Sequence, residues 1–160
     1  MLILDLMNKN VERASVLDTA TISDALDRLG IDGVCRGIKP RSHSFCLAGR
    51  AYTVKYGPID KQSPGTVGDF IDDLKPGTVV VLDNGGQEDM TVWGDILTEL
   101  AHKKGLAGTV IDGPNRDIQL CLELNYPIFS RSYSMRTGKD RVQVEAEQIP
   151  VSIGKVRVSP

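Results

Sequence analysis

A continuous apolar run at residues 78–82, TVVVL, constrains the fold of this 160-residue chain more than any other segment. An apolar run of this length without alternation is typical of a strand buried on both faces of a parallel sheet. Strand patterns follow at 108–112 and 127–130, with helical patterns at 95–104 and 116–124 between them. The order β-α-β-α-β predicts neighbouring parallel strands joined by right-handed crossovers. The sequence therefore predicts an α/β fold in which helices flank a central parallel or mixed β-sheet.

Shorter elements are expected on either side of this unit, and the chain reads as a single compact domain over residues 1–160. Residues 19–30 carry a helical pattern with Ile22, Ala25, Leu26 and Leu29 on one face, and Gly30 suits the positive φ of a helix end. Residues 49–54 alternate like a strand. Further strand-like pieces lie at 142–144, 151–153 and 156–158.

Three details of this prediction are specific enough to be tested by a structure. Thr66 is expected to cap a short helix that Pro76-Gly77 closes. The segment Gly113-Pro114-Asn115 is expected to form a turn. The helix at 95–104 is expected to turn four residues inward: Ile96, Leu97, Leu100 and Ala101.

Composition excludes several classes of function. The net charge is -2, with neither sign gathered into a block, which argues against a nucleic-acid footprint or a polybasic membrane surface. No apolar run approaches the roughly 18 residues that a membrane span needs, and the N-terminus lacks the pattern of a signal peptide. Cys35, Cys46 and Cys121 are an odd number without zinc or disulfide spacing, so we expect buried free thiols in a reducing, cytoplasmic protein.

Charged residues stand where the two central helices are expected to begin. Asp95 opens the helix after the first buried strand, and Arg116 and Asp117 open the helix after the second. The carboxyl ends of neighbouring parallel strands lie roughly 5 Å apart, and helix N-termini point at the ligand site there. The pattern therefore predicts that Asp95, Arg116 and Asp117 converge at one edge of the sheet.

The chemistry of such a cluster is restricted. Free N–H groups at helix N-termini and the fork of Arg116 suit a carboxylate. Two carboxylates are hard oxygen donors that suit Mg²⁺ or Mn²⁺, and the absence of a His-rich set argues against zinc. The combination suggests a small 2-oxo acid bound beside a divalent metal. The same residues also fit a plainer reading, in which the aspartates only favour helix starts and the Arg-Asp pair is solvated.

Other interpretations of individual residues stay open. A Schiff-base aldolase would need a lysine of lowered pKa, and Lys55, Lys75, Lys103 and Lys104 are available, although lysines are usually solvated. Trp93 either walls the pocket or packs the entry of the helix. The glycine-rich loop at 84–86 matches no nucleotide-binding motif.

Several segments resemble the RraA-like family, which includes 4-hydroxy-4-methyl-2-oxoglutarate aldolases and regulators of ribonuclease E activity. They are Trp93-Gly94-Asp95-Ile96-Leu97-Thr98, Gly108-Thr109-Val110-Ile111-Asp112-Gly113, Arg116-Asp117 and Tyr126-Pro127-Ile128-Phe129-Ser130-Arg131. The helix at 21–26, the strand at 49–54 and residues 150–154 also look similar, so the resemblance covers nearly the whole chain. Its central motif, D-x20-R-D, is matched in full. The resemblance implies an RraA-like fold, of the swivelling-domain type.

For function, the resemblance implies a class II aldolase that cleaves such 2-oxo acids to pyruvate and decarboxylates oxaloacetate through a metal-stabilised enolate. It assigns the metal ligand to Asp117 and a water-mediated metal contact to Asp95. Arg116, with the Gly94–Leu97 segment and the N–H groups of Ile96 and Leu97, would hold the pyruvate part of the substrate. Asp95 and Arg116 are thus the candidate catalytic residues.

The resemblance also implies a homotrimer or hexamer with the site at a subunit boundary. Two departures concern the proton donor. Some motif descriptions add an acid just after the Arg-Asp pair, whereas Glu123 is the first acid here. Longer aldolases supply a glutamate from a neighbouring subunit's C-terminal tail, and this chain is expected to stop short of that tail. The alternative is a non-catalytic regulator that binds and inhibits ribonuclease E.

Overall fold

The structure, a computed structural model, describes residues 2–160, with side chains from residue 9 onward. Its helices are α1 (Leu2–Ser15), α2 (Thr19–Arg28), the 3-10 helix η1 (Asp69–Asp73), α3 (Asp95–Lys103) and α4 (Ile118–Glu123). Its strands are β1 (Lys39–Pro40), β2 (Arg50–Pro58), β3 (Thr78–Asp83), β4 (Gly108–Asn115), β5 (Ile128–Tyr133), β6 (Val142–Glu147), β7 (Val151–Ile153) and β8 (Val156–Val158). No helix of this described part is long and apolar enough to cross a membrane.

The predicted parallel unit forms the centre of a six-stranded mixed sheet of order β1-β5-β4-β3-β2-β6. Strands β2, β3, β4 and β5 are parallel, and β1 and β6 close the two edges in antiparallel orientation. Strands β7 and β8 form a separate hairpin. The α/β class and the central mixed sheet are therefore confirmed.

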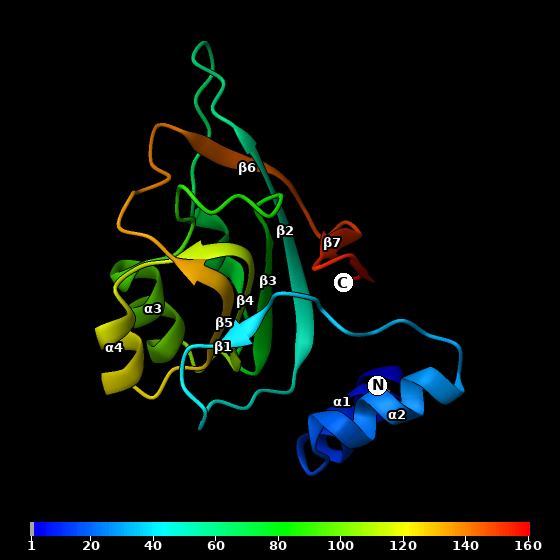
Figure 1. Ribbon diagram of the computed structural model, residues 1–160. Coiled ribbons are helices and arrows are strands. Elements are labelled where there is room, and N and C mark those ends of the chain that lie inside the picture. Colours follow the sequence, from blue (N-terminus) through cyan, green and yellow to red (C-terminus); the bar gives the residue numbers. More distant parts are fainter. Residues whose placement is uncertain (1) are drawn as a thin grey trace.

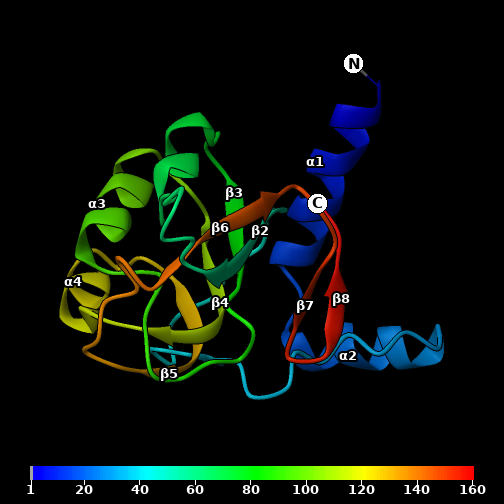
Figure 2. The same ribbon diagram turned by 90° about the horizontal axis from the view of Figure 1, so that it is seen from above.

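The apolar run in β3 is buried on both faces because each face has its own cover (Figures 1 and 2). Helices α3 and α4 lie on one face, where Val80 and Leu82 join the larger hydrophobic core. The β7–β8 hairpin lies on the other face, where Val79 and Val81 pack with Ile153. Alternate side chains of one strand thus serve two cores, which explains why the run shows no polar alternation.

Helix α2 confirms the predicted helix at 19–30, and its apolar face is not buried against the sheet. Gly30 has a φ of +71°, as the helix end requires. In this chain α2 has no buried residue, and the side chain of Leu29 is 72% exposed. Figures 1 and 2 show α2 lying apart from α3 and α4. The apolar face exists as predicted, but its cover does not come from the core of the sheet.

Two local predictions are wrong because backbone pairing decides these segments. Thr66 caps no helix, since η1 begins at Asp69 after Gly68, and the Thr66 carbonyl accepts from the Val144 N–H at 2.9 Å. The segment 113–115 is not a turn but the end of β4, where Pro114 and Asn115 pair with β5 after a register shift. Proline is tolerated in a strand at such an irregularity.

The expected inward face of α3 is also partly wrong. Ala101 is buried and Leu97 half-buried, but Ile96 and Leu100 are 70% and 38% exposed. The second fully buried position, beside Ala101, is Thr98, whose hydroxyl accepts a hydrogen bond from Trp93 Nε1 at 2.9 Å. A polar residue can take this place because its hydrogen bonds are satisfied inside the protein.

Candidate functional site

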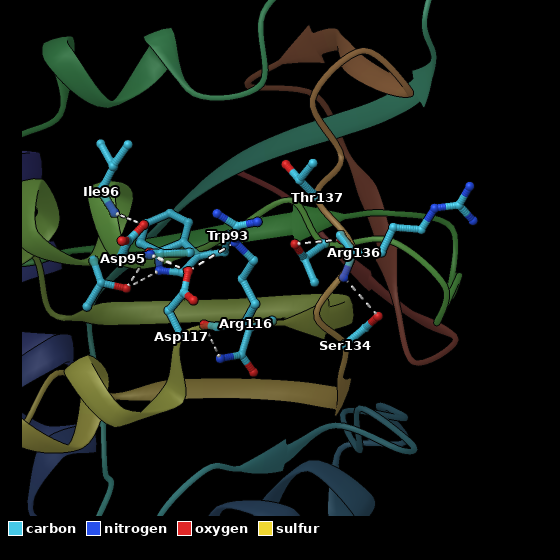
Figure 3. A network of polar contacts seen from close by, with 12 residues as sticks. Trp93, Asp95, Ile96, Arg116, Asp117, Ser134, Arg136 and Thr137 are labelled. Atoms are coloured by element: carbon cyan, nitrogen blue, oxygen red, sulfur yellow. Dashed lines mark hydrogen bonds and ion pairs between the residues drawn. The ribbon is translucent and has the colours of Figure 1, made fainter.

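Asp95, Arg116 and Asp117 meet at the carboxyl edge of the sheet, as the sequence predicted (Figure 3). One carboxylate oxygen of Asp117, Oδ2, accepts from the Asp95 N–H at 3.1 Å and from Arg116 Nε at 3.0 Å. The Arg116 and Asp117 side chains are 35% and 36% exposed, so this ion pair remains open to solvent. Two crossovers of the sheet thus bring one carboxylate, one guanidinium and one helix N-terminus together.

Asp117 itself has a backbone conformation that is uncommon for a residue with a side chain. Its φ and ψ are 55° and 41°, in the left-handed region, and α4 begins only at Ile118. The prediction that Arg116 and Asp117 lie inside the helix is therefore wrong by two residues. Such a conformation costs on the order of 1–3 kcal/mol and is typical of residues held in place for function. It turns the Asp117 carboxylate back toward the start of α3.

The backbone before Asp117 is anchored in the interior. The Arg116 N–H donates to the Trp93 carbonyl at 3.2 Å, which ties the end of β4 to the segment before α3. Asn115 is fully buried, and its Oδ1 accepts from the Ser130 hydroxyl of β5 at 2.8 Å. Arg116 therefore leaves a rigid strand end rather than a mobile loop.

Gly94 allows the close approach of the two halves of the site. A Cβ at this position would lie 2.8 Å from Asp117 Oδ2 and 3.0 Å from Arg116 Nε. The first separation is shorter than real Cβ contacts and the second is very tight, so a side chain here would require the ion pair to shift. The sequence placed Gly94 at the substrate, and the structure places it directly against the charged pair.

The first turn of α3 offers one free backbone donor rather than the expected two. The Ile96 N–H donates to Asp95 Oδ1 at 2.8 Å. Among residues 2–160, no group accepts from the Leu97 N–H. An N-terminal turn with a free N–H is suited to an anion. Leu97 is thus the available donor, and Ile96 becomes one only when Asp95 turns away.

A cavity of about 130 Å³ lies beside the ion pair and is lined by Trp93, Gly94, Asp95, Ile96, Leu97 and Arg116 among others. Both interpretations of Trp93 hold, since it lines this cavity and is also buried, with its ring stacked on Tyr126. The lining also includes Val67 and Val92, together with the polar residues Thr91, Thr137 and Lys139, which sequence reasoning missed. Thr137 is carried by the irregular segment after β5 and reaches the site through a bridge with Thr91, which no periodic pattern signals.

The donor set fits a weakly held hard cation. Within the described residues, no three His, Cys, Asp or Glu side chains are grouped to hold a metal ion. Asp95 and Asp117 provide two carboxylates, and Mg²⁺ is commonly held by one or two carboxylates with water and substrate completing the shell. Asp117 Oδ1 forms no hydrogen bond with residues 2–160, so it is available to a ligand.

The four lysines considered for a Schiff base lie elsewhere. Lys55 pairs with Glu145 at 3.6 Å and Lys103 with Glu99 at 2.7 Å, and Lys104 Nζ donates to the Asp72 carbonyl at 2.7 Å. Lys75 is exposed. None of the four lines the cavity beside Arg116.

The three cysteines are free, as expected, but they are not all buried. Cys46 is exposed and Cys35 half-buried, whereas Cys121 is fully buried beneath the site. Burial raises the pKa of the Cys121 thiol, so it stays protonated at neutral pH.

Comparison with known proteins gives relatives that are longer than this chain. DlpA of Legionella pneumophila is 39% identical over 98% of the chain. A protein of Halalkalibacterium halodurans named "Putative 4-hydroxy-4-methyl-2-oxoglutarate aldolase" is 33% identical over 90% of it. The chain spans 26% of DlpA and 66% of the second protein.

The fold is also found among solved structures. The crystal structure of Streptomyces coelicolor RraAS2, described as an unusual member of the RNase ES inhibitor RraA protein family, superposes with a TM-score of 0.82. It is 25% identical, and the match covers 94% of this chain and 76% of that one. The family model described as RraA-like, Aldolase/RraA, matches residues 19–160, and the chain belongs to this RraA-like family.

Proposed function

We propose that the protein is a divalent-metal-dependent lyase that cleaves 4-hydroxy-4-methyl-2-oxoglutarate-type 2-oxo acids to pyruvate and decarboxylates oxaloacetate. The observation that carries the proposal is the shared Asp117 carboxylate, which accepts from Arg116 and from the start of α3 while its second oxygen stays free. Several relatives named as putative aldolases of this kind support a lyase. Pyruvate release from oxaloacetate is the experiment that tests it.

Asp117 would hold Mg²⁺ or Mn²⁺ directly, with Asp95 contacting the ion through water. When bound, the metal would act as a Lewis acid that withdraws the negative charge developing on the substrate's 2-oxo group. The protein's part is to keep Asp117 in place. The Arg116 Nε and Asp95 N–H both donate to Oδ2, so Oδ1 would be the oxygen that binds the cation.

Arg116 would clamp the carboxylate next to the 2-oxo group. Only Nε of its guanidinium is used by the protein, since among residues 2–160 the two terminal nitrogens form no hydrogen bond. Those nitrogens carry four N–H groups, and a fork of this kind matches a carboxylate. The Leu97 N–H provides a further donor at the same cavity. The pyruvate part of the substrate would therefore be fixed at one end.

Assembly is a further part of the proposal. Segment 16–34 exposes five large apolar side chains: Val16 (82%), Leu17 (47%), Leu29 (72%), Ile31 (50%) and Val34 (50%). Exposed apolar groups gathered in one segment are typical of an interface. We propose that another copy of the chain covers them in a homotrimer or hexamer, with the site near the boundary between copies.

A second candidate function is binding and inhibition of ribonuclease E without catalysis. The relative that favours it is RraAS2, through the inhibitor family named in its description. A pure binder has no need for a free metal-facing carboxylate. If the wild-type protein releases no pyruvate and directly inhibits the ribonuclease, this candidate is favoured over the lyase.

A further inference from the structure

A buried polar cluster lies directly beneath the site, and of its members Trp93 and Gly94 also line the cavity. Its centre is the Thr98 hydroxyl on α3, which is fully buried. Thr98 Oγ1 donates to the Gly94 carbonyl at 2.7 Å and accepts from Trp93 Nε1 at 2.9 Å. The hydroxyl therefore holds the side chain of Trp93 and the backbone of Gly94, the two residues that precede Asp95.

The same cluster reaches the other half of the site through Cys121 on α4. The Cys121 sulfur lies 3.5 Å from Thr98 Oγ1 and 3.7 Å from the Asp117 carbonyl, and its single proton can be donated to either oxygen while the sulfur stays in contact with both. Cys121 is fully buried. One hydroxyl and one thiol thus connect the residue before Asp95 to the strained residue Asp117.

We infer that Thr98 is a positioning residue that, with Cys121, sets the distance between the Asp95 segment and the Asp117 carboxylate. Gly94 makes this distance critical, because even an added Cβ there would lie only 2.8 Å from Asp117 Oδ2 and 3.0 Å from Arg116 Nε. Catalytic groups must be held to about 0.5 Å for efficient turnover. The inference rests on the proposed lyase function and names the device that holds its geometry.

The alternative is a purely structural role, in which the Thr98 hydroxyl only accepts the hydrogen bond of the buried Trp93 N–H. Removal of the hydroxyl would then lower stability and leave the site unchanged. Thr98→Val removes the hydroxyl at nearly constant shape, and Thr98→Ser keeps it. Thr53→Val is a matched control, since Thr53 is also fully buried and its hydroxyl donates to a backbone carbonyl, that of Ile149, at 2.6 Å.

The test measures kcat and KM for oxaloacetate decarboxylation, together with the Mn²⁺ dissociation constant by electron paramagnetic resonance. All variants are compared at equal folded fraction. Thr98→Val is expected to lower kcat about tenfold and weaken Mn²⁺ binding severalfold, because a small displacement of reacting groups is costly. Thr98→Ser should restore kcat to within about twofold, and Thr53→Val should leave both quantities unchanged.

Wild-type kcat and Mn²⁺ affinity in Thr98→Val would overturn the inference. If Thr98→Val does not fold, Cys121→Ala provides the same comparison, with a smaller loss of kcat expected and wild-type values contradicting the inference. If the wild-type protein releases no pyruvate, the lyase proposal fails by itself. Crystal structures then decide about Thr98: a shift of about 0.5 Å between Gly94 and Asp117 in the valine variant supports positioning, and no shift refutes it.

Discussion

Asp117 accepts a hydrogen bond from the backbone N–H of Asp95 at 3.1 Å, although 22 residues separate them in the chain. The bond joins the residue before α4 to the first residue of α3. It exists because β3 and β4 are neighbouring parallel strands, so both crossovers return to the same edge. This hydrogen bond is therefore a direct consequence of the topology of the sheet.

Substitution of Gly94 by alanine tests how closely these two segments must approach. The new Cβ would lie 2.8 Å from Asp117 Oδ2, so we expect the ion pair to move and kcat/KM for oxaloacetate to fall about 10- to 100-fold. Gly65→Ala is the control, because Gly65 does not line the cavity and its Cβ would meet the Gln143 side chain at 3.2–3.3 Å, a tight contact outside the site. Equal activity in the two variants would show that turnover does not require the close approach that Gly94 allows.

Removal of the Arg116 guanidinium tests the proposed carboxylate clamp. Arg116→Ala is expected to lower kcat/KM about 100-fold or more while leaving the urea midpoint nearly unchanged, because the side chain is one third exposed. Arg116→Lys keeps the charge without the fork and should recover little activity. Wild-type turnover in the alanine variant would mean that the substrate carboxylate binds elsewhere.

A charged residue on the apolar face of α2 tests the proposed assembly. Leu29→Asp should reduce the mass measured by light scattering from that of an oligomer to that of one chain, because an unpaired charge is costly in an apolar interface. Asp24→Asn, an exposed polar change on the same helix, should leave the oligomer intact. A monomeric wild-type protein, or an oligomer that survives Leu29→Asp, would contradict this part of the account.

Alkaline pH should destabilise the protein through its tyrosines. Burial raises the pKa of Tyr52 from 10.0 to about 12 and also raises that of Tyr126. Above pH 10 the unfolded chain loses phenolic protons that the folded chain keeps, so the free energy of unfolding falls as the pH rises toward 12. Urea titrations between pH 8 and pH 11.5 measure this slope. It should become shallower in Tyr52→Phe, and an unchanged slope would exclude a contribution from Tyr52.

The sequence predicted the fold well where a pattern repeats. The apolar run at 78–82 identified the strand that is buried on both faces, and the helix positions followed from their periodicity. Local detail was less predictable. Pro114 is a residue typical of turns, yet pairing with β5 keeps it in a strand. Thr98 is a polar residue that the pattern does not place inside, yet its hydroxyl forms its hydrogen bonds within the core.

For the site, the sequence predicted which residues meet but not how they are held. Convergence of Asp95, Arg116 and Asp117 follows from chain topology, which a motif can express. The left-handed conformation of Asp117 and the approach of Gly94 depend on three-dimensional packing. Thr137 and Lys139 reach the cavity from an irregular segment, and no spacing rule connects them to Arg116.

The most direct test of the central claim is pyruvate release from oxaloacetate by the purified wild-type chain with Mg²⁺, with excess EDTA, and by Asp117→Ala with Mg²⁺. Our account predicts turnover in the first case and loss of at least about 100-fold in the other two, because Asp117 is the proposed metal ligand. Asp140→Ala, a change at an exposed aspartate outside the cavity lining, should retain wild-type activity. Turnover that persists in EDTA or in Asp117→Ala would contradict a metal-dependent reaction at this site.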